Sequence, residues 1–246
     1  AKMGEVLTNS QIGGRRNMVI NGAMQVAQRN TSIADIGASS GYFTLDRYNL
    51  APSGTAGRLT MSQVAVTDLP GFANALKLDC TTADTSIAAG EFLLLEQGFE
   101  GQDVQQIKKG TSDAEKVTVS FYVKGNASAT YVVELFDNDN SRSVSQSFSV
   151  TTSWNRVILT FPADTSGTLD DDNAKSLRLF FWLHSGSTYA GGSLGTTWHT
   201  TAANRAAGIS SFFDSTDREF FLTGLQMEIG EQATPFEHRS FGEELA

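Results

Sequence analysis

The feature that most constrains this chain is the stretch of residues 116–161, in which three turn signals separate four runs of alternating side chains. In the first run, apolar side chains occupy every second position from Val117 to Val123, with Thr, Ser and Tyr between them. Because successive side chains of a strand point to opposite faces, this alternation predicts a strand with one core face and one solvated face. Four such runs in succession predict sequential hairpins and an all-β fold, an antiparallel sandwich or barrel.

Size and composition fit one main domain of this class. The chain has 246 residues, 40% of them hydrophobic, with 23 glycines and only 4 prolines, which favours many tight turns over a disordered chain. We expect residues 17–240 to form a single β-sandwich domain with an N-terminal hairpin. Residues 1–16 are expected to be a polar arm or linker, and residues 241–246 a C-terminal tail.

Charge and cysteine content exclude several classes of protein. The net charge of −9 opposes nucleic-acid binding, which relies on Lys and Arg to neutralise phosphates. The chain has no apolar run long enough for a transmembrane helix and no signal-peptide core, so membrane insertion is not expected. The one cysteine, Cys80, cannot form an internal disulfide and lies in a strand-like run, where a structural thiol is expected.

Turn residues and alternation also predict the remaining elements. Two short apolar runs around Asn21-Gly22 predict the small hairpin, over residues 17–29. Residues 42–48 are expected to form a strand. Further strands are expected over residues 57–66, 75–80, 91–98, 176–184 and 221–229. Residues 102–109 are expected to form a short helix or an irregular crossing, and residues 200–207 one or two helical turns.

Both ends of the chain carry motifs of a known family. GRRNMVINGAMQVAQRNTS, followed by SGYFTLDRY, resembles the opening of bacteriophage tail-fibre and receptor-binding proteins, and FFLTGLQMEIGEQATPFEHR resembles their closing signature. This resemblance implies a homotrimeric virion protein on the exterior of the tail or capsid. It also implies two kinds of partner: a host surface polysaccharide, and other virion proteins contacted through residues 1–16.

The middle of the chain is similar to carbohydrate-binding modules with a galactose-binding-like jelly-roll sandwich. The similarity is carried by Leu95-Glu96-Gln97, by residues 116–125 and 154–161, and by the strand over residues 221–229. These are mostly core and turn positions, so the similarity supports the jelly-roll fold more strongly than it supports sugar binding.

The strand over residues 176–184 is the best candidate for a binding site. Its odd-numbered apolar side chains are expected to face inward, which leaves Arg178, Phe180, Trp182 and His184 outward. An aromatic ring beside polar groups can stack on a sugar. The predicted ligand-binding residues are Tyr122, Trp182, His184, Tyr189 and Trp198. The alternative is that this face is covered by the Gly/Ser-rich loop of residues 185–195, by an N-terminal segment or by a neighbouring subunit.

We expect no cofactor or metal. The loop from Asp137 begins like a calcium-binding loop but has Arg142 in place of the turn glycine and Phe148 in place of the bidentate glutamate. Structural calcium, which related modules often hold, is therefore not supported by a motif. The acidic run Asp170-Asp171-Asp172 is expected to be a solvated turn.

No set of residues predicts catalysis. The three histidines have no zinc-type spacing, and no nucleophile elbow occurs. The leading hypothesis is a tail-fibre or spike protein that contacts host glycan and is not an enzyme. The first alternative is a purely structural virion component: a head fibre, capsid decoration or tail adaptor. A glycan-degrading enzyme is a third hypothesis, because the carboxylates of such a site meet only in space.

Overall fold

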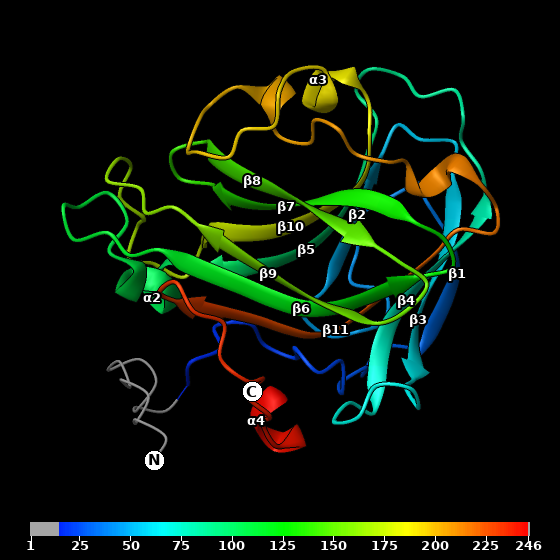
Figure 1. Cartoon of the computed structure of the whole chain (residues 1–246), viewed down its shortest axis with the longest axis horizontal. Coiled ribbons are helices and arrows are strands. Elements are labelled where there is room, and N and C mark those ends of the chain that lie inside the picture. Colours follow the sequence, from blue (N-terminus) through cyan, green and yellow to red (C-terminus); the bar gives the residue numbers. More distant parts are fainter. Residues whose placement is uncertain (1–14, 246) are drawn as a thin grey trace, which may run out of the picture.

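The computed structural model describes residues 15–245 as two antiparallel sheets packed face to face (Figure 1). Within these residues, one sheet has six strands in the order β1-β3-β4-β11-β6-β9, and the other has five in the order β2-β5-β10-β7-β8. The expected all-β fold, an antiparallel sandwich of jelly-roll type, is confirmed. Residues 1–14, which make up most of the expected N-terminal arm, lie outside the described part of the chain.

Strands make up most of the regular structure, and the helical elements are single turns of three or four residues. The strands are β1 (Ser32–Ile36), β2 (Asn49–Ser53), β3 (Arg58–Ala65), β4 (Asn74–Thr82), β5 (Phe92–Glu100), β6 (Val117–Gly125), β7 (Ala129–Asp137), β8 (Arg142–Val150), β9 (Asn155–Phe161), β10 (Lys175–Ser185) and β11 (Glu219–Ile229). The helical turns are α2 (Gly101–Val104), η1 (Gln105–Ile107), α3 (Ser187–Ala190), η2 (Ala202–Asn204), η3 (Phe212–Asp214) and α4 (Phe241–Glu244).

The four strands expected over residues 116–161 are present as β6 to β9, but they do not form successive hairpins. Of the consecutive strands among these four, only β7 and β8 pair, in the five-stranded sheet. Strands β6 and β9 pair in the six-stranded sheet, so the chain crosses between the sheets after β6 and again after β8. Alternation defines which side chains share a face but not which strand lies alongside, so the crossings were not predictable from the pattern.

The core lies between the sheets and is rich in aromatic side chains. Phe121 packs edge-to-face on Phe148 and on Phe181, with ring centroids 5.1 Å apart in both pairs. Such contacts add to the free energy gained by removing the rings from water. Cys80 is buried in β4, as expected for a structural thiol, and burial raises its pKa to about 11.

The hairpin expected over residues 17–29 is not formed, and no strand lies there. Asn21 and Met24 have left-handed backbone angles, and the Asn21 side chain bonds both the N–H and the C=O of Val26, closing a wider loop. The flanking run bonds to β11 instead: the Met18 N–H donates to Met227 O at 2.9 Å. Long-range pairing therefore replaces the local pairing that the Asn-Gly turn predicted.

The strand expected over residues 42–48 is also absent. Arg47 has a positive φ of 73°, which interrupts an extended run, and β2 begins only at Asn49. Leu45 and Tyr48 are buried nonetheless, and the Tyr48 hydroxyl donates to Asn21 O at 3.3 Å. The apolar residues of this run thus anchor a loop rather than a strand.

The outer face of β6 is not solvated along its whole length, contrary to the expectation. Thr118 and Ser120 are buried, and the chain directly after β11 contacts Thr118. The Thr118 hydroxyl donates to Gly230 O at 2.7 Å. Only the end of the strand that carries Tyr122 and Lys124 is partly exposed. No helix of residues 15–245 has the length and apolar character needed to cross a membrane.

Candidate functional site

The outer face of the five-stranded sheet carries aromatic and charged side chains from three adjacent strands. On β10, Arg178, Phe180 and Trp182 share this face. The register places Phe180 between Glu96 of β5 and Glu134 of β7. Each acidic residue thus lies beside an aromatic ring, an arrangement that can hold both apolar and hydrogen-bonding groups of a ligand.

A groove of about 380 Å³ lies over this face. We call it the outer groove. The nearly fully buried Phe180 and Trp182 lie at its base, β2 contributes Ala51 and Ser53, and α3 contributes Tyr189. The remaining lining residues are Ser40, Pro52, Phe92, Leu94, Phe136, Arg178 and Arg205. Its size is within the range of small-ligand sites, and apolar surface with a few fixed polar groups is typical of them.

One end of the groove is organised by Glu96 and Arg178. Two guanidinium nitrogens of Arg178 donate to the Glu96 carboxylate at 2.9 and 2.7 Å, and Lys175 Nζ adds a contact at 3.1 Å. Burial alone would raise the pKa of Glu96, but the hydrogen bonds and charges of Arg178 and Lys175 outweigh it and lower that pKa. The same guanidinium lies 4.7 Å from the centre of the Phe180 ring. The ion pair therefore fixes a planar cation against the aromatic base of the groove.

A second ion pair organises the other side. Glu134 is fully buried, and Arg205 donates to it at 2.7 and 3.0 Å. Trp182 Nε1 donates to the same carboxylate at 2.6 Å. The Arg205 guanidinium lies 4.6 Å from the Phe136 ring centre and 5.1 Å from that of Trp182. These bonds hold the indole and the guanidinium in fixed orientations, as a preorganised binding surface requires.

Residues 186–209, which we call the covering segment, account for the burial of the face. Its side chains Tyr189, Ala190, Leu194, Ala206 and Ile209 pack with Phe180 and Trp182. Figure 1 shows α3 and the adjoining loops above the five-stranded sheet. The expectation that Trp182 is an exposed platform is wrong, because only 1% of the residue is exposed. The alternative, a cover formed by the loop after β10, is confirmed.

The predicted residue Tyr189 does lie beside Trp182. Their ring centroids are 5.2 Å apart, and Phe92 completes the cluster with its ring 5.6 Å from that of Tyr189. Both Tyr189 and Phe92 are partly exposed, so they are the aromatic rings of this cluster that a ligand in the groove can reach.

The expectation that His184 faces outward is wrong, because it pairs with the core residue Leu93 and packs against Phe213, and it is fully buried. It lies near Asp84 and Glu91 rather than in the groove. Burial lowers its pKa, an effect that the nearby carboxylates of Glu91 and Asp84 only partly oppose. A bulge between Trp182 and His184 changes the register at this point, which the alternation alone did not reveal.

Tyr122 and Trp198 lie away from the groove. Tyr122 is on the other sheet and packs against Phe72, in an aromatic cluster completed by Phe236 and His238. Trp198 donates from Nε1 to Pro162 O at 2.8 Å, and its ring lies 4.8 Å from Lys109 Nζ. The five predicted residues therefore do not form one site: Trp182 and Tyr189 meet, and the other three do not join them.

Sequence reasoning missed Phe136 and Arg205, which line the groove, and Glu96 and Glu134, whose carboxylates hold its two arginines. Glu96, Glu134 and Phe136 occupy outward positions of strands whose register relative to β10 was unknown. Arg205 lies in a loop with no pattern of its own. A signal was present in β5 and β7, because an acidic residue in the middle of each apolar run requires a buried partner.

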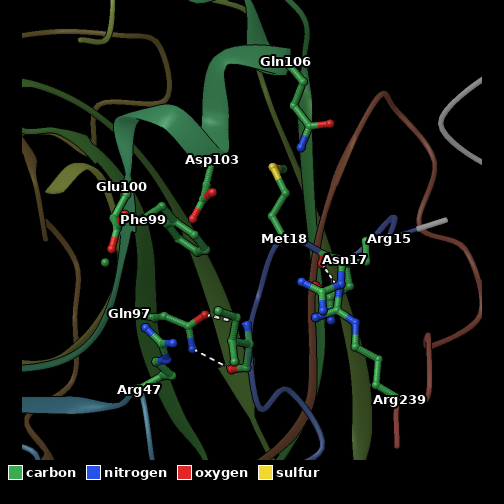
Figure 2. A pocket seen from close by; sticks show the side chains of 12 residues that line it. Arg15, Asn17, Met18, Arg47, Gln97, Phe99, Glu100, Asp103, Gln106 and Arg239 are labelled. Atoms are coloured by element: carbon green, nitrogen blue, oxygen red, sulfur yellow. Dashed lines mark hydrogen bonds between the residues drawn. The ribbon is translucent and has the colours of Figure 1, made fainter. Parts of the chain in front are cut away.

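A second cavity, of about 190 Å³, lies beneath the N-terminal segment (Figure 2). Gln97 closes one side by bonding both the N–H and the C=O of Ile20 at 2.9 Å. On the other side Arg239 donates to the backbone carbonyls of Asn17 and Val19. Gln97 thus joins the beginning of the domain to β5, and Arg239 joins it to the C-terminal segment, which favours a structural role for this cavity.

The acidic loop after β7 is occupied by a side-chain cation. Asp137 and Asp164 both contact the buried ammonium of Lys109, which lies 3.1 Å from the Asp164 carboxylate. Lys109 Nζ also donates to Ser166 O at 2.9 Å and to Gly167 O at 2.8 Å. The three aspartates at positions 170–172 are exposed, as expected for a solvated turn.

No protein-family model matches the chain, and no curated protein matches it either. Several solved structures are similar to it at low identity. A family 4 carbohydrate-binding module is 12% identical with a TM-score of 0.45; the match covers 85% of this chain and 97% of the module. A family 61 carbohydrate-binding module in complex with β-1,4-galactotriose is 9% identical with a TM-score of 0.45, covering 87% of this chain and 99% of the module.

The enzymatically active domain of tailspike protein 4 from bacteriophage CBA120 is 12% identical with a TM-score of 0.44. The match covers 87% of this chain but only 21% of that protein. These likenesses concern the course of the chain alone, and the sandwich is defined by the two sheets described above. The resemblance of the terminal motifs to phage tail-fibre proteins stays a prediction.

Proposed function

We propose that this protein binds a carbohydrate, without chemical conversion, in the outer groove. The observation that carries the proposal is the pairing of the partly exposed rings of Phe92 and Tyr189 with the fixed guanidinium groups of Arg178 and Arg205 in one groove. A sugar ring presents an apolar C–H face and a rim of hydroxyls. Aromatic faces match the first and charged hydrogen-bonding groups match the second.

The biological setting that we propose is the exterior of a tailed bacteriophage, where the protein acts as a homotrimeric tail-fibre or spike component that contacts host surface polysaccharide. This setting is supported by the two terminal motifs. In the structure they pack together, since Asn17 N–H donates to Glu237 at 2.7 Å and Asn17 Nδ2 donates to Leu225 O at 3.1 Å. A trimer would offer three grooves, and avidity would then strengthen weak single contacts.

The test is binding of the purified protein to host cells and to their extracted surface polysaccharide. We expect Tyr189→Ala and Phe92→Ala to weaken polysaccharide binding about tenfold each, because a ring contact is typically worth on the order of 1 kcal/mol. Tyr122→Ala removes a partly exposed ring from the other sheet and should bind like the wild type. Circular dichroism and gel filtration confirm that all variants are folded and equally oligomeric.

Trp182→Ala is a poor variant for this purpose. Trp182 is buried and donates to Glu134, so its removal would leave a cavity and take away one of the hydrogen bonds that hold this carboxylate. If only Tyr122→Ala loses binding, the binding site lies on the six-stranded sheet instead of in the outer groove. If neither the wild type nor any variant binds cells or polysaccharide, the groove proposal fails and a purely structural virion role is favoured. The complete burial of Trp182 under the covering segment is the observation consistent with that role.

A further inference from the structure

Three metal-ligating side chains from separate parts of the chain converge beside the covering segment. Asp84 follows β4, Glu91 directly precedes β5, and His184 lies near the end of β10. One ligand atom from each lies within 4.8 Å of the other two. All three residues are buried, with 6%, 7% and 0% exposed, so this is not a solvated acidic surface patch.

Two of these side chains carry buried polar atoms without a hydrogen-bond partner among the described residues. These atoms are Glu91 Oε2 and His184 Nε2, and they face each other at 3.4 Å. Leaving such an atom unpaired typically costs on the order of 1–3 kcal/mol, so buried polar groups are nearly always satisfied. A cation held between them would satisfy both atoms at once.

The surrounding hydrogen bonds hold the three side chains in orientation. His184 Nδ1 lies 2.8 Å from Ser211 Oγ, and that hydroxyl in turn accepts from the Phe213 N–H at 3.1 Å. The Asp84 carboxylate accepts from the Thr55 hydroxyl and the Ala56 N–H, both at 2.8 Å. A histidine whose second ring nitrogen is held by a polar group is the usual arrangement at a protein metal centre.

The ligand set selects the kind of ion. Two carboxylates and one imidazole suit a divalent transition metal, whereas calcium prefers 6–8 oxygen ligands. A 2+ charge would also balance the two carboxylates. Zinc bonds nitrogen and oxygen ligands at about 2.0–2.2 Å, so binding would draw the three atoms closer together, with water completing the coordination.

We propose that Asp84, Glu91 and His184 form a zinc site that ties the covering segment to the sandwich. The segment begins at Gly186, whose N–H donates to Glu91 O at 2.8 Å, and Thr188 N–H donates to Ala89 O at 2.9 Å. An ion bound to the Glu91 and His184 side chains would therefore stabilise the start of the segment that carries Tyr189. This proposal goes beyond glycan binding and does not depend on it.

The test uses the full-length protein after treatment with a chelator and removal of that chelator. Calorimetric titration with zinc chloride is expected to show one zinc per chain and a rise in melting temperature. Glu91→Gln, which keeps the shape of the side chain, and His184→Gln should each weaken zinc binding at least about tenfold and lose that rise. His238→Gln removes an exposed histidine outside the cluster and should bind zinc like the wild type.

Circular dichroism checks that the variants fold. If His184→Gln does not fold, the zinc binding of Glu91→Gln alone decides the outcome. The proposal is overturned if the wild type binds no stoichiometric zinc at 100 μM, a concentration of the order at which weak sites fill. It is equally overturned if Glu91→Gln binds zinc as tightly as the wild type. If calcium binds as tightly as zinc and raises the melting temperature as much, the assignment to a transition metal is contradicted.

Discussion

Lys109 occupies an environment made almost entirely of oxygen atoms. Two carboxylates, from Asp137 and Asp164, and two backbone carbonyls surround its ammonium group, and the Trp198 ring lies 4.8 Å away. A buried charge is tolerated only when it is paired and its hydrogen-bonding capacity is met, and here both conditions hold. The residue is therefore a structural cation of the turn region after β7.

Replacing Lys109 by Met should destabilise the protein strongly. The substitution keeps the length of the side chain but leaves the buried Asp137 carboxylate without its cation, while Asp164 keeps only its pair with Arg142. Breaking a buried ion pair in this way typically costs about 3–5 kcal/mol. Urea denaturation monitored by tryptophan fluorescence measures the change in the free energy of unfolding.

Lys108→Met is the matched control, because Lys108 pairs with Glu115 at the exposed surface. Such a pair is worth at most about 1 kcal/mol. Equal losses in the two variants would contradict the role assigned to Lys109.

Individual residue roles were the least predictable part of the chain. Lys109 lies in a run expected to be a short helix or irregular crossing, and nothing in its neighbours indicates that two aspartates 28 and 55 positions away meet it. The prediction for Trp182 failed in a different way. Its face of the strand was predicted correctly, but its exposure was not, because alternation carries no information about a loop that folds back over the sheet.

Among the elements, strands were predictable and their partners were not. Long alternating runs identified β6 to β10 because burial on at least one face requires a period of two. The segment over residues 17–29 shows why local signals fail elsewhere. Its Asn-Gly turn favours a hairpin, but bonds to β11 at Met227 and Leu225 outweigh that preference.

The last helical turn, α4, tests how much such long-range contacts stabilise the fold. Its buried Glu244 accepts a hydrogen bond from the Asn21 N–H. Deleting residues 240–246, or substituting Glu244→Ala, should lower the free energy of unfolding by about 1–3 kcal/mol, because a buried N–H loses its acceptor.

Glu231→Ala is the control for this experiment, because Glu231 forms only an exposed pair with Lys116. The comparison is made from the urea midpoints of the three proteins and the wild type. A deletion as harmless as the control would show that α4 does not contribute to the stability of the sandwich.

For the whole molecule, acid should be destabilising. Burial alone would raise the pKa values of Glu96 and Asp164, but hydrogen bonds from Arg178 to Glu96, and from Arg142 and Lys109 to Asp164, lower both pKa values below the ordinary ones. Carboxyl groups with depressed folded pKa values contribute stability above their unfolded pKa of about 4. That contribution is lost as the pH falls through the folded pKa.

We therefore expect these two groups to change the urea midpoint little between pH 7 and pH 5. At pH values below about 4 the midpoint should decrease. Because both carboxylates are buried, raising the salt concentration should weaken this dependence only slightly. A midpoint that stays constant or rises from pH 5 to pH 3 would contradict the ion-pair assignment.

The C-terminal segment and the outer groove lie on opposite sides of the sandwich. The chain after β11 crosses the outer face of the six-stranded sheet, Arg16 bonds to that segment at Glu237, and α3 stands over the other sheet (Figure 1). A sensor surface that captures the protein through its carboxyl end would therefore leave the groove facing the flowing solution. Coupling through random surface lysines offers no such orientation, because Lys175 lies beside the Arg178 end of the groove.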